Sequence, residues 1–164
     1  MTRRQINFEE LQQLYVLTGR GIWHLQYLES AINMLITLKK DIKYPSSVSL
    51  EEANRIHSKN KANTLGVSLK IVEEENLVSD ELLGMLKDFK EERNWLVHRS
   101  LDQNGEDLYL DELRYILIKR IESFSANAIK LRKLVSDEVI DFNVSKGVSK
   151  DWINQYAEQQ SNSL

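Results

Sequence analysis

The chain has 164 residues and a mass of 19.2 kDa, enough for one domain that buries its own core. Its 22 basic and 25 acidic residues give a net charge of −3. This charge argues against a broad electrostatic grip on nucleic acid or acidic membranes, although it leaves room for a local basic patch. One proline and six glycines are too few for the turns of a β-sandwich or barrel, so long helices are expected.

Cysteine is absent, which excludes disulfides, thiolate metal sites and a cysteine nucleophile. No apolar run approaches the length of a signal-peptide core or of a membrane span. We therefore expect a cytoplasmic protein that makes no contact with membranes.

The first predicted helix covers residues 6 to 42. Asn7 and Glu10 have the spacing of a capping box. Gly19 and Gly21 interrupt the helix, and they are compatible either with a kink or close helix crossing or with a break. Apolar residues recur along this segment at the spacing of one helix face: Leu11, Leu14, Leu25, Leu28, Ile32 and Leu35.

Three further long helices follow the single proline, Pro45. Ser49 and Glu52 form a second capping box, which opens a helix from residue 50 to 77. The third helix starts after Ser79 and runs towards residue 98, and the polar run 102–105 predicts a turn. The fourth helix covers residues 108 to 135 and has the clearest apolar stripe: Leu110, Leu113, Leu117, Ile121, Phe124, Ala128, Leu131 and Val135.

The apolar pattern weakens after Ser136, where we expect an irregular segment. Ser149 has the position of a cap for a short last helix with Trp152, Ile153 and Tyr156 facing inward, followed by a frayed tail. The sequence therefore predicts an all-α fold. Residues 1–136 form an antiparallel up-down four-helix bundle, and residues 137–164 form a C-terminal appendage with a short helix.

Most templates for catalysis are missing from the sequence. It has neither a P-loop nor a dinucleotide-binding glycine motif. His24, His57 and His98 are far apart, and none has the spacing of a histidine metal site. We therefore expect no metal and no cofactor.

One arginine stands out on the third predicted helix. Arg93 falls in the middle of an apolar face that also carries Leu82, Leu86, Phe89, Leu96 and Val97. Such an arginine must be paired, must reach solvent with its charged end, or must face an interface. One reading is a bundle arginine paired with Glu91, Glu92 or an acid on a neighbouring helix, with His98 on the surface.

In the other interpretation, Arg93 and His98 act together in one functional site. In an unbroken α-helix the two would point roughly 140° apart, at ~100° per residue. Cooperation between them therefore requires either a helix end near His98 or a second copy of the helix.

The pattern Arg93-Asn94-x-x-x-His98 near the end of the third helix resembles the signature of the HEPN family, an arginine and a histidine separated by four to six residues. Asn94 matches the polar residue that often follows the arginine in that family. The resemblance covers roughly residues 6 to 136, although its specific part is only these three residues.

The resemblance implies a metal-independent endoribonuclease, a toxin or an anti-phage defence protein that works as a twofold dimer. His98 would act as general acid or base, Arg93 would stabilise charge on the phosphate, and Asn94 would orient the phosphate or the histidine. The products would be a 2′,3′-cyclic phosphate and a 5′-hydroxyl. The implied partners are RNA, a second copy of the chain, and an antitoxin or regulatory protein.

The neighbours of this motif add one candidate and one departure. Arg99 is a candidate contact to the RNA backbone, or alternatively a surface cation. Ser100 stands where HEPN toxins with a nucleotidyltransferase antitoxin carry a tyrosine, which argues against that particular partnership. Trp23 and Trp95 fit helix packing better than base stacking.

Two alternatives to a nuclease remain open. The chain is compatible with a non-catalytic HEPN-fold interaction module, because Ile116, Ile118 and Ile129 lie off the main apolar stripe of the fourth helix. It is also compatible with a nucleotide-binding regulator in which Arg93 grips a phosphate.

Overall fold

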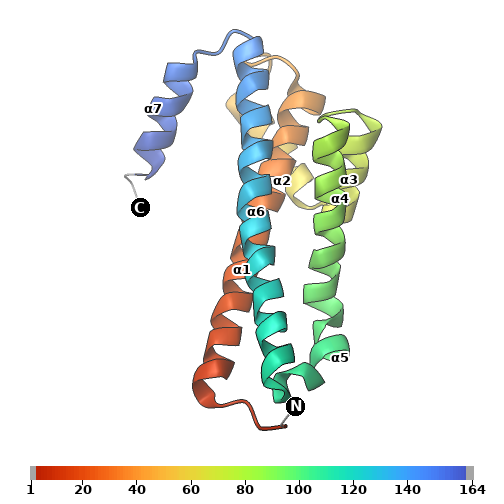
Figure 1. Cartoon of the computed structure of the whole chain (residues 1–164). Coiled ribbons are helices and arrows are strands. Elements are labelled where there is room, and N and C mark those ends of the chain that lie inside the picture. Colours follow the sequence, from red (N-terminus) through yellow and green to blue (C-terminus); the bar gives the residue numbers. More distant parts are fainter. Residues whose placement is uncertain (1–2, 162–164) are drawn as a thin grey trace. The chain divides into compact units, whose positions relative to one another are not determined.

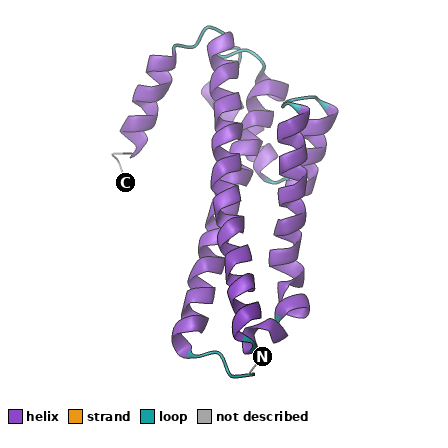
Figure 2. Cartoon of the chain, viewed as in Figure 1, coloured by secondary structure: helices purple, strands orange, loops and turns teal. Residues whose placement is uncertain are grey.

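The computed structural model describes the fold of residues 3–161 and the side chains of residues 3–155. Over that stretch the chain is helical apart from connecting loops and an isolated bridge between Arg3 and Leu110 (Figure 2). The all-α class is therefore confirmed. The α-helices are labelled in Figure 1. In chain order the elements are α1 (Phe8–Ile36), η1 (Thr37–Ile42), α2 (Leu50–Lys61), α3 (Leu65–Glu74), α4 (Asp80–Asn94), η2 (Trp95–Arg99), α5 (Ser100–Asn104), η3 (Glu106–Tyr109), α6 (Asp111–Ser145) and α7 (Lys150–Ser161).

The first predicted helix has the expected extent, but its last part changes pitch. Asn7 caps α1, since its side-chain oxygen accepts from the Glu10 backbone N–H at 2.9 Å and its own N–H donates to the Glu10 carboxylate at 3.0 Å. The helix continues through the glycines, so the predicted break is wrong. A Cβ at Gly21 would lie 3.2 Å from the Phe124 ring, which identifies a close helix crossing. From residue 37 the chain continues as the π-helix η1.

The helix predicted over residues 50–77 is in fact two helices, so this prediction was wrong. Ser49 caps α2 as expected. α2 ends at Lys61, and Thr64 then caps α3 because its hydroxyl accepts from the Val67 backbone N–H. The polar residues before Leu65 therefore mark a second helix start.

The third predicted helix does not end at His98, which corrects a second expectation. Its α-helical part, α4, passes into the π-helix η2 and then into the short helix α5. The turn expected over residues 102–105 is reduced to Gly105 and the 3₁₀-helix η3 that follows it. Gly105 fits because a Cβ there would lie only 2.6 Å from the Leu101 carbonyl oxygen.

The segment after Ser136 is helical, not irregular as expected, because α6 continues to Ser145. Gly147, with φ of 92°, lies in the loop after α6, and α7 begins after Ser149 as predicted. Trp152 is 60% exposed and does not face inward. The side chain of Tyr156 and residues 162–164 of the expected tail lie outside the described part.

The chain forms two compact units. Unit 1 comprises Met1–Glu29 with Glu81–Arg132, and unit 2 comprises Ser30–Asp80 with Lys133–Leu164. Helices α1 and α6 each contribute residues to both units, and residue 136, the expected boundary, lies inside α6.

The core of unit 1 is built where three helices meet. The rings of Phe89 on α4 and Phe124 on α6 stack with centroids 4.7 Å apart, and Gly21 on α1 lies against Phe124. The predicted apolar stripes supply most of the remaining buried side chains of this unit: Leu25, Leu28, Leu82, Leu86, Leu96, Leu117, Ile121, Ala128 and Leu131.

Unit 1 also contains a buried arginine that ties the N-terminal segment to α6. Arg114 is 3% exposed, forms ion pairs with Asp111 and with Glu10 at 3.1 Å, and donates to the Leu108 carbonyl at 2.7 Å. Close by, the Arg4 backbone N–H donates to the Tyr109 carbonyl at 2.9 Å. Two parts of the chain that are about a hundred positions apart are thus held together.

The core of unit 2 contains a buried polar network. Thr37 Oγ1 donates to the Asn33 carbonyl at 2.8 Å and accepts from Asn60 Nδ2 at 2.9 Å. It also lies 3.3 Å from His57 Nδ1. Its single proton is already used, so His57 must be the donor in that contact. Ser68 Oγ donates to Asn33 Oδ1 at 2.9 Å.

Among the described residues, no helix combines the length and the apolar character that crossing a membrane requires.

Candidate functional site

The π-helix η2 brings Arg93 and His98 together within one chain. The Arg93 Nη1 atom lies 3.3 Å from His98 Nε2. Arg93 lies near the end of α4 and His98 lies within η2. In a π-helix the backbone hydrogen bonds join residues five apart, so the wider turn of η2 returns His98 towards the side of the helix that carries Arg93. The expectation that the pair needs a helix end or a second copy of the chain was therefore wrong. The same change of pitch turns Val97 outward, with 42% exposure, although it was expected on the apolar face.

Asn94 completes the contact on the same guanidinium group. Arg93 Nη1 donates to Asn94 Oδ1 at 3.2 Å. Because a guanidinium group has only donors, its approach to His98 is a hydrogen bond only when Nε2 carries no proton. The contact is thus a hydrogen bond in the tautomer that carries its proton on Nδ1 and a lone pair on Nε2. The three residues of the sequence motif form one connected cluster.

The rest of Arg93 lies in a half-buried, acidic environment. Its Nε atom is buried and has no hydrogen-bond partner. Glu29 on α1 lies within electrostatic range of Arg93. Burial raises the pKa of the Glu29 carboxyl above its ordinary value, and the positive charge of Arg93 opposes this rise. Arg93 is thus directed at Asn94 and His98, while an acid of another helix balances part of its charge.

The acids next to Arg93 in the sequence are engaged elsewhere. Glu92 accepts two hydrogen bonds from Arg120, at 2.9 and 2.7 Å, and these bonds lower the pKa of its carboxyl group. Glu91 lies 3.9 Å from the guanidinium of Arg99, and its carbonyl accepts from Arg99 at 3.4 Å. Arg99 is exposed but bends back to Glu91, so it lies beside the cluster without joining it.

Trp95, the residue after Asn94, is buried and does not offer a stacking surface. Its indole N–H donates to Asn104 Oδ1 at 2.9 Å, and the Arg120 guanidinium lies 3.5 Å from its ring centre. Packing, the expected role, is therefore confirmed for Trp95. Trp23 is 63% exposed and lies 6.2 Å from the Tyr27 ring, so the expectation of a packing role does not hold for it.

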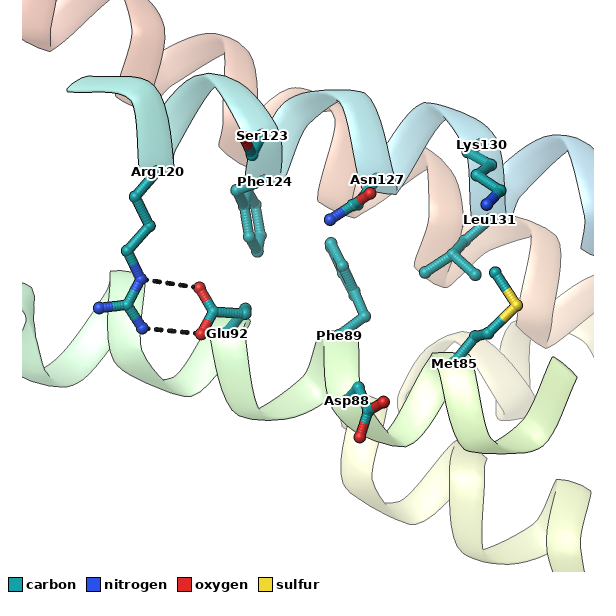
Figure 3. Close-up of a pocket in the computed structure, with 10 residues that line it drawn as sticks. All are labelled: Met85, Asp88, Phe89, Glu92, Arg120, Ser123, Phe124, Asn127, Lys130 and Leu131. Carbon is teal, nitrogen blue, oxygen red and sulfur yellow. Dashed lines mark hydrogen bonds and ion pairs between the residues drawn. The ribbon is translucent and has the colours of Figure 1, made fainter. Parts of the chain in front are cut away.

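A groove between α4 and α6 has a volume of about 320 Å³. Figure 3 shows Phe89 and Phe124 pointing into it, with the Arg120–Glu92 pair at one end. Arg93, Asn94 and His98 are not among its lining residues. The groove and the motif cluster are thus distinct features of unit 1.

Sequence reasoning did not single out Glu29, Arg120 or Asn104. Glu29 lies outside the apolar stripe of α1, and nothing in its sequence context links it to Arg93. Arg120 follows Leu117 by three positions on a helix rich in charge, so it resembles a solvent-facing residue. Asn104 was assigned to a turn. No sequence pattern reveals a π-helix in advance, and that element decides which side chains meet.

The cluster combines an imidazole ring with a fixed positive charge. His98 is exposed, so a ligand can reach the imidazole, and Arg93 offers planar donors suited to phosphate oxygens. A base and an anion-stabilising group at such a distance suit proton transfer at a phosphate ester. Among the described residues, no three His, Asp or Glu side chains are grouped so that they could hold a metal ion.

Comparisons of the chain with protein-family models, with curated proteins and with solved structures found no match. The likeness to the HEPN family is therefore carried by Arg93, Asn94 and His98 alone.

Proposed function

We propose that the protein is a metal-independent endoribonuclease of the HEPN type, with Arg93, Asn94 and His98 as its active-site residues. The observation that carries the proposal is the 3.3 Å contact between Arg93 Nη1 and His98 Nε2. A match of residue types at this spacing would arise by chance in many helical proteins. A π-helix that brings the two side chains into contact is a stronger argument, because such elements occur frequently at functional sites.

In the proposed reaction, the RNA phosphate replaces His98 as the hydrogen-bond partner of the Arg93 guanidinium. His98 Nε2 then acts as a base. The imidazole removes the proton from the 2′-hydroxyl, and the 2′-oxygen attacks the adjacent phosphorus. The bond from phosphorus to the 5′-oxygen breaks, and that oxygen receives a proton from a second imidazolium. The products are a 2′,3′-cyclic phosphate and a 5′-hydroxyl. Arg93 stabilises the charge that develops on the phosphate oxygens.

We place this reaction in a twofold homodimer of four-helix bundles. The contact between Arg93 and His98 forms within one chain, so the second copy is not needed to assemble the pair. Its role in the proposal is to supply the second imidazole, which protonates the leaving oxygen. Arg99 lies beside the cluster and joins the RNA backbone contacts if its contact with Glu91 is exchanged for a phosphate. A toxin or phage-defence role, with an antitoxin or regulatory partner, follows from the resemblance.

The test is cleavage of a broad panel of RNAs in EDTA by the wild type and by His98→Ala. We expect wild-type cleavage with 2′,3′-cyclic phosphate ends, and loss of at least about 100-fold in rate for the variant. Lys90→Ala is a matched control, because Lys90 lies on α4 near the motif and is not part of the cluster. Equal cleavage by wild type and His98→Ala, or none by either, contradicts the proposal.

A second candidate function is a non-catalytic interaction module. It is favoured by exposed apolar side chains near the start of α6, where Tyr115 and Ile116 are 62% and 61% exposed. This alternative predicts that Ile116→Glu abolishes assembly with a partner, while Arg93→Ala alters no RNA cleavage.

A further inference from the structure

The angular relationship between Arg93 and His98 depends on η2 keeping its π-helical pitch. If these residues relaxed to an α-helix, five steps of ~100° would carry His98 roughly 140° away from Arg93. π-Helices are rare and occur as single turns inside α-helices. The contact at 3.3 Å therefore requires neighbouring groups that hold η2 in place.

Trp95, the first residue of η2, is held on one side by α6. Its side chain is 2% exposed, and the Arg120 guanidinium lies over its ring at 3.5 Å. The two hydrogen bonds from Arg120 to Glu92 fix the plane of that guanidinium, as Figure 3 shows. Arg120 therefore contacts two residues that flank the motif: Glu92, which precedes Arg93, and Trp95, which follows Asn94.

Trp95 is held on its other edge by α5. The indole N–H donates to Asn104 Oδ1 at 2.9 Å, and Asn104 Nδ2 donates to Asp107 Oδ2 at 2.7 Å. The end of η2 has a further support, because Ser100 Oγ donates to the Leu96 carbonyl at 2.8 Å. The Ser100 hydroxyl thus provides a hydrogen-bond donor to a backbone carbonyl inside η2.

We infer that Trp95, Arg120 and Asn104 are positioning residues that lock η2 and thereby hold His98 against Arg93. None of the three is placed to touch RNA in the proposed reaction, and they act through the pitch of η2. The inference has a geometric consequence, the position of the His98 imidazole, and a catalytic consequence, the rate of RNA cleavage. Only the catalytic consequence rests on the proposed function.

The geometric consequence is tested by NMR of the His98 imidazole in the full chain. We expect the wild type to show the tautomer with the proton on Nδ1 and a hydrogen-bonded Nε2. Arg120→Met removes the planar charge and both bonds to Glu92, and Asn104→Leu removes the acceptor of the indole N–H. Both variants should shift the Nε2 resonance towards that of a histidine free in solvent. Arg120→Lys serves as a milder variant should the first one fail to fold.

Arg132→Met is the matched control, because Arg132 also lies on α6 and over an aromatic ring, that of Tyr27 at 5.6 Å. It should leave the His98 spectrum unchanged. An unchanged His98 spectrum in folded Arg120→Lys and Asn104→Leu overturns the inference, as does an equal shift in Arg132→Met.

The catalytic consequence is tested by steady-state RNA cleavage. We expect Arg120→Lys to lower kcat by about 10- to 100-fold with little change in KM, because a displacement of the order of 1 Å at reacting groups has such effects. On a His98→Ala background the same change should have no further effect. Additive losses would identify a purely structural role. An inactive wild type whose His98 spectrum still responds to Arg120→Lys contradicts the nuclease proposal and supports the lock.

Discussion

Arg93 and His98 lie in hydrogen-bond contact, with 3.3 Å between Nη1 and Nε2, although they are five residues apart on a continuous helical segment. A regular α-helix would place them on different faces, and η2 removes that separation. The contact between Arg93 and His98 thus depends on the π-helical pitch of η2 as well as on the two residue types.

The planar guanidinium of Arg93 should be essential, not only its charge. Arg93→Lys keeps the charge and loses the fork that contacts Asn94 and His98, so kcat/KM for RNA cleavage should fall by about 100-fold. The matched control is Arg132→Lys, because Arg132 lies on α6 near the Tyr27 ring and is not part of the cluster. Undiminished cleavage by Arg93→Lys would show that cationic charge alone is sufficient. An equal loss in the control variant would show that the effect is not specific to the cluster. The thermal midpoint of each variant reports whether the fold is intact.

Two buried serines should respond in opposite ways to the same substitution. Ser68 Oγ donates to Asn33 inside unit 2, so Ser68→Ala should lower the free energy of unfolding by about 1–2 kcal/mol. Ser125 Oγ in unit 1 is buried and has no hydrogen-bond partner. Ser125→Ala should therefore be neutral or stabilising. Denaturant unfolding of the two variants measures the difference, and a costlier Ser125→Ala would refute this reading of the two sites.

Gly105 and Gly84 give a second matched pair. A Cβ at Gly105 would lie 2.6 Å from the Leu101 carbonyl oxygen, so Gly105→Ala should destabilise the protein by about 1–3 kcal/mol. Gly84 lies inside α4 with nothing within 4 Å of its Cβ position. Gly84→Ala should stabilise by about 0.5–1 kcal/mol, because alanine costs less backbone entropy in a helix. Thermal unfolding of both variants is the measurement, and a loss of stability in Gly84→Ala would contradict it.

Stability should fall on mild acidification because of His57. Burial, and secondarily the charge of Lys61, lower the pKa of His57 below its ordinary value of 6.5. The unfolded chain therefore takes up the proton first as the pH falls, and the folded state loses stability below about pH 6.5. His57→Gln should flatten the decline in thermal midpoint between about pH 7.5 and 5.5. Carboxylates contribute equally to both proteins, so identical pH profiles would exclude this role of His57.

The sequence predicted the helices whose signals are local. The capping boxes at Asn7 and Ser49 begin helices as expected, and the stripe from Leu117 to Val135 is buried. The errors concern features that depend on tertiary contacts. Thr64 caps a separate helix, which the continuous apolar periodicity of residues 50–77 did not reveal. Helix α6 extends about ten residues beyond the end of its apolar stripe at Val135.

The same division applies to the candidate site. Arg93 was recognised because an arginine on an apolar stripe requires an explanation. The contact with His98 was not predicted to form along a continuous helical segment, because helical wheels assume a constant pitch. The buried Trp95 and the distant Arg120 support η2 through packing across helices, and no spacing rule in the sequence expresses such packing.

The junction between the N-terminal segment and the start of α6 has a consequence for the newly made chain. The Arg4 backbone N–H donates to Tyr109, and Glu10 pairs with Arg114, so both residues are synthesised about a hundred residues before these distant partners. At ~5–20 residues per second, Arg4 and Glu10 exist for several seconds before these distant partners are made. The segment that contains Arg4 and Glu10 is thus made early and packs against its partners late. A truncated product that stops before Tyr109 lacks both of these partners.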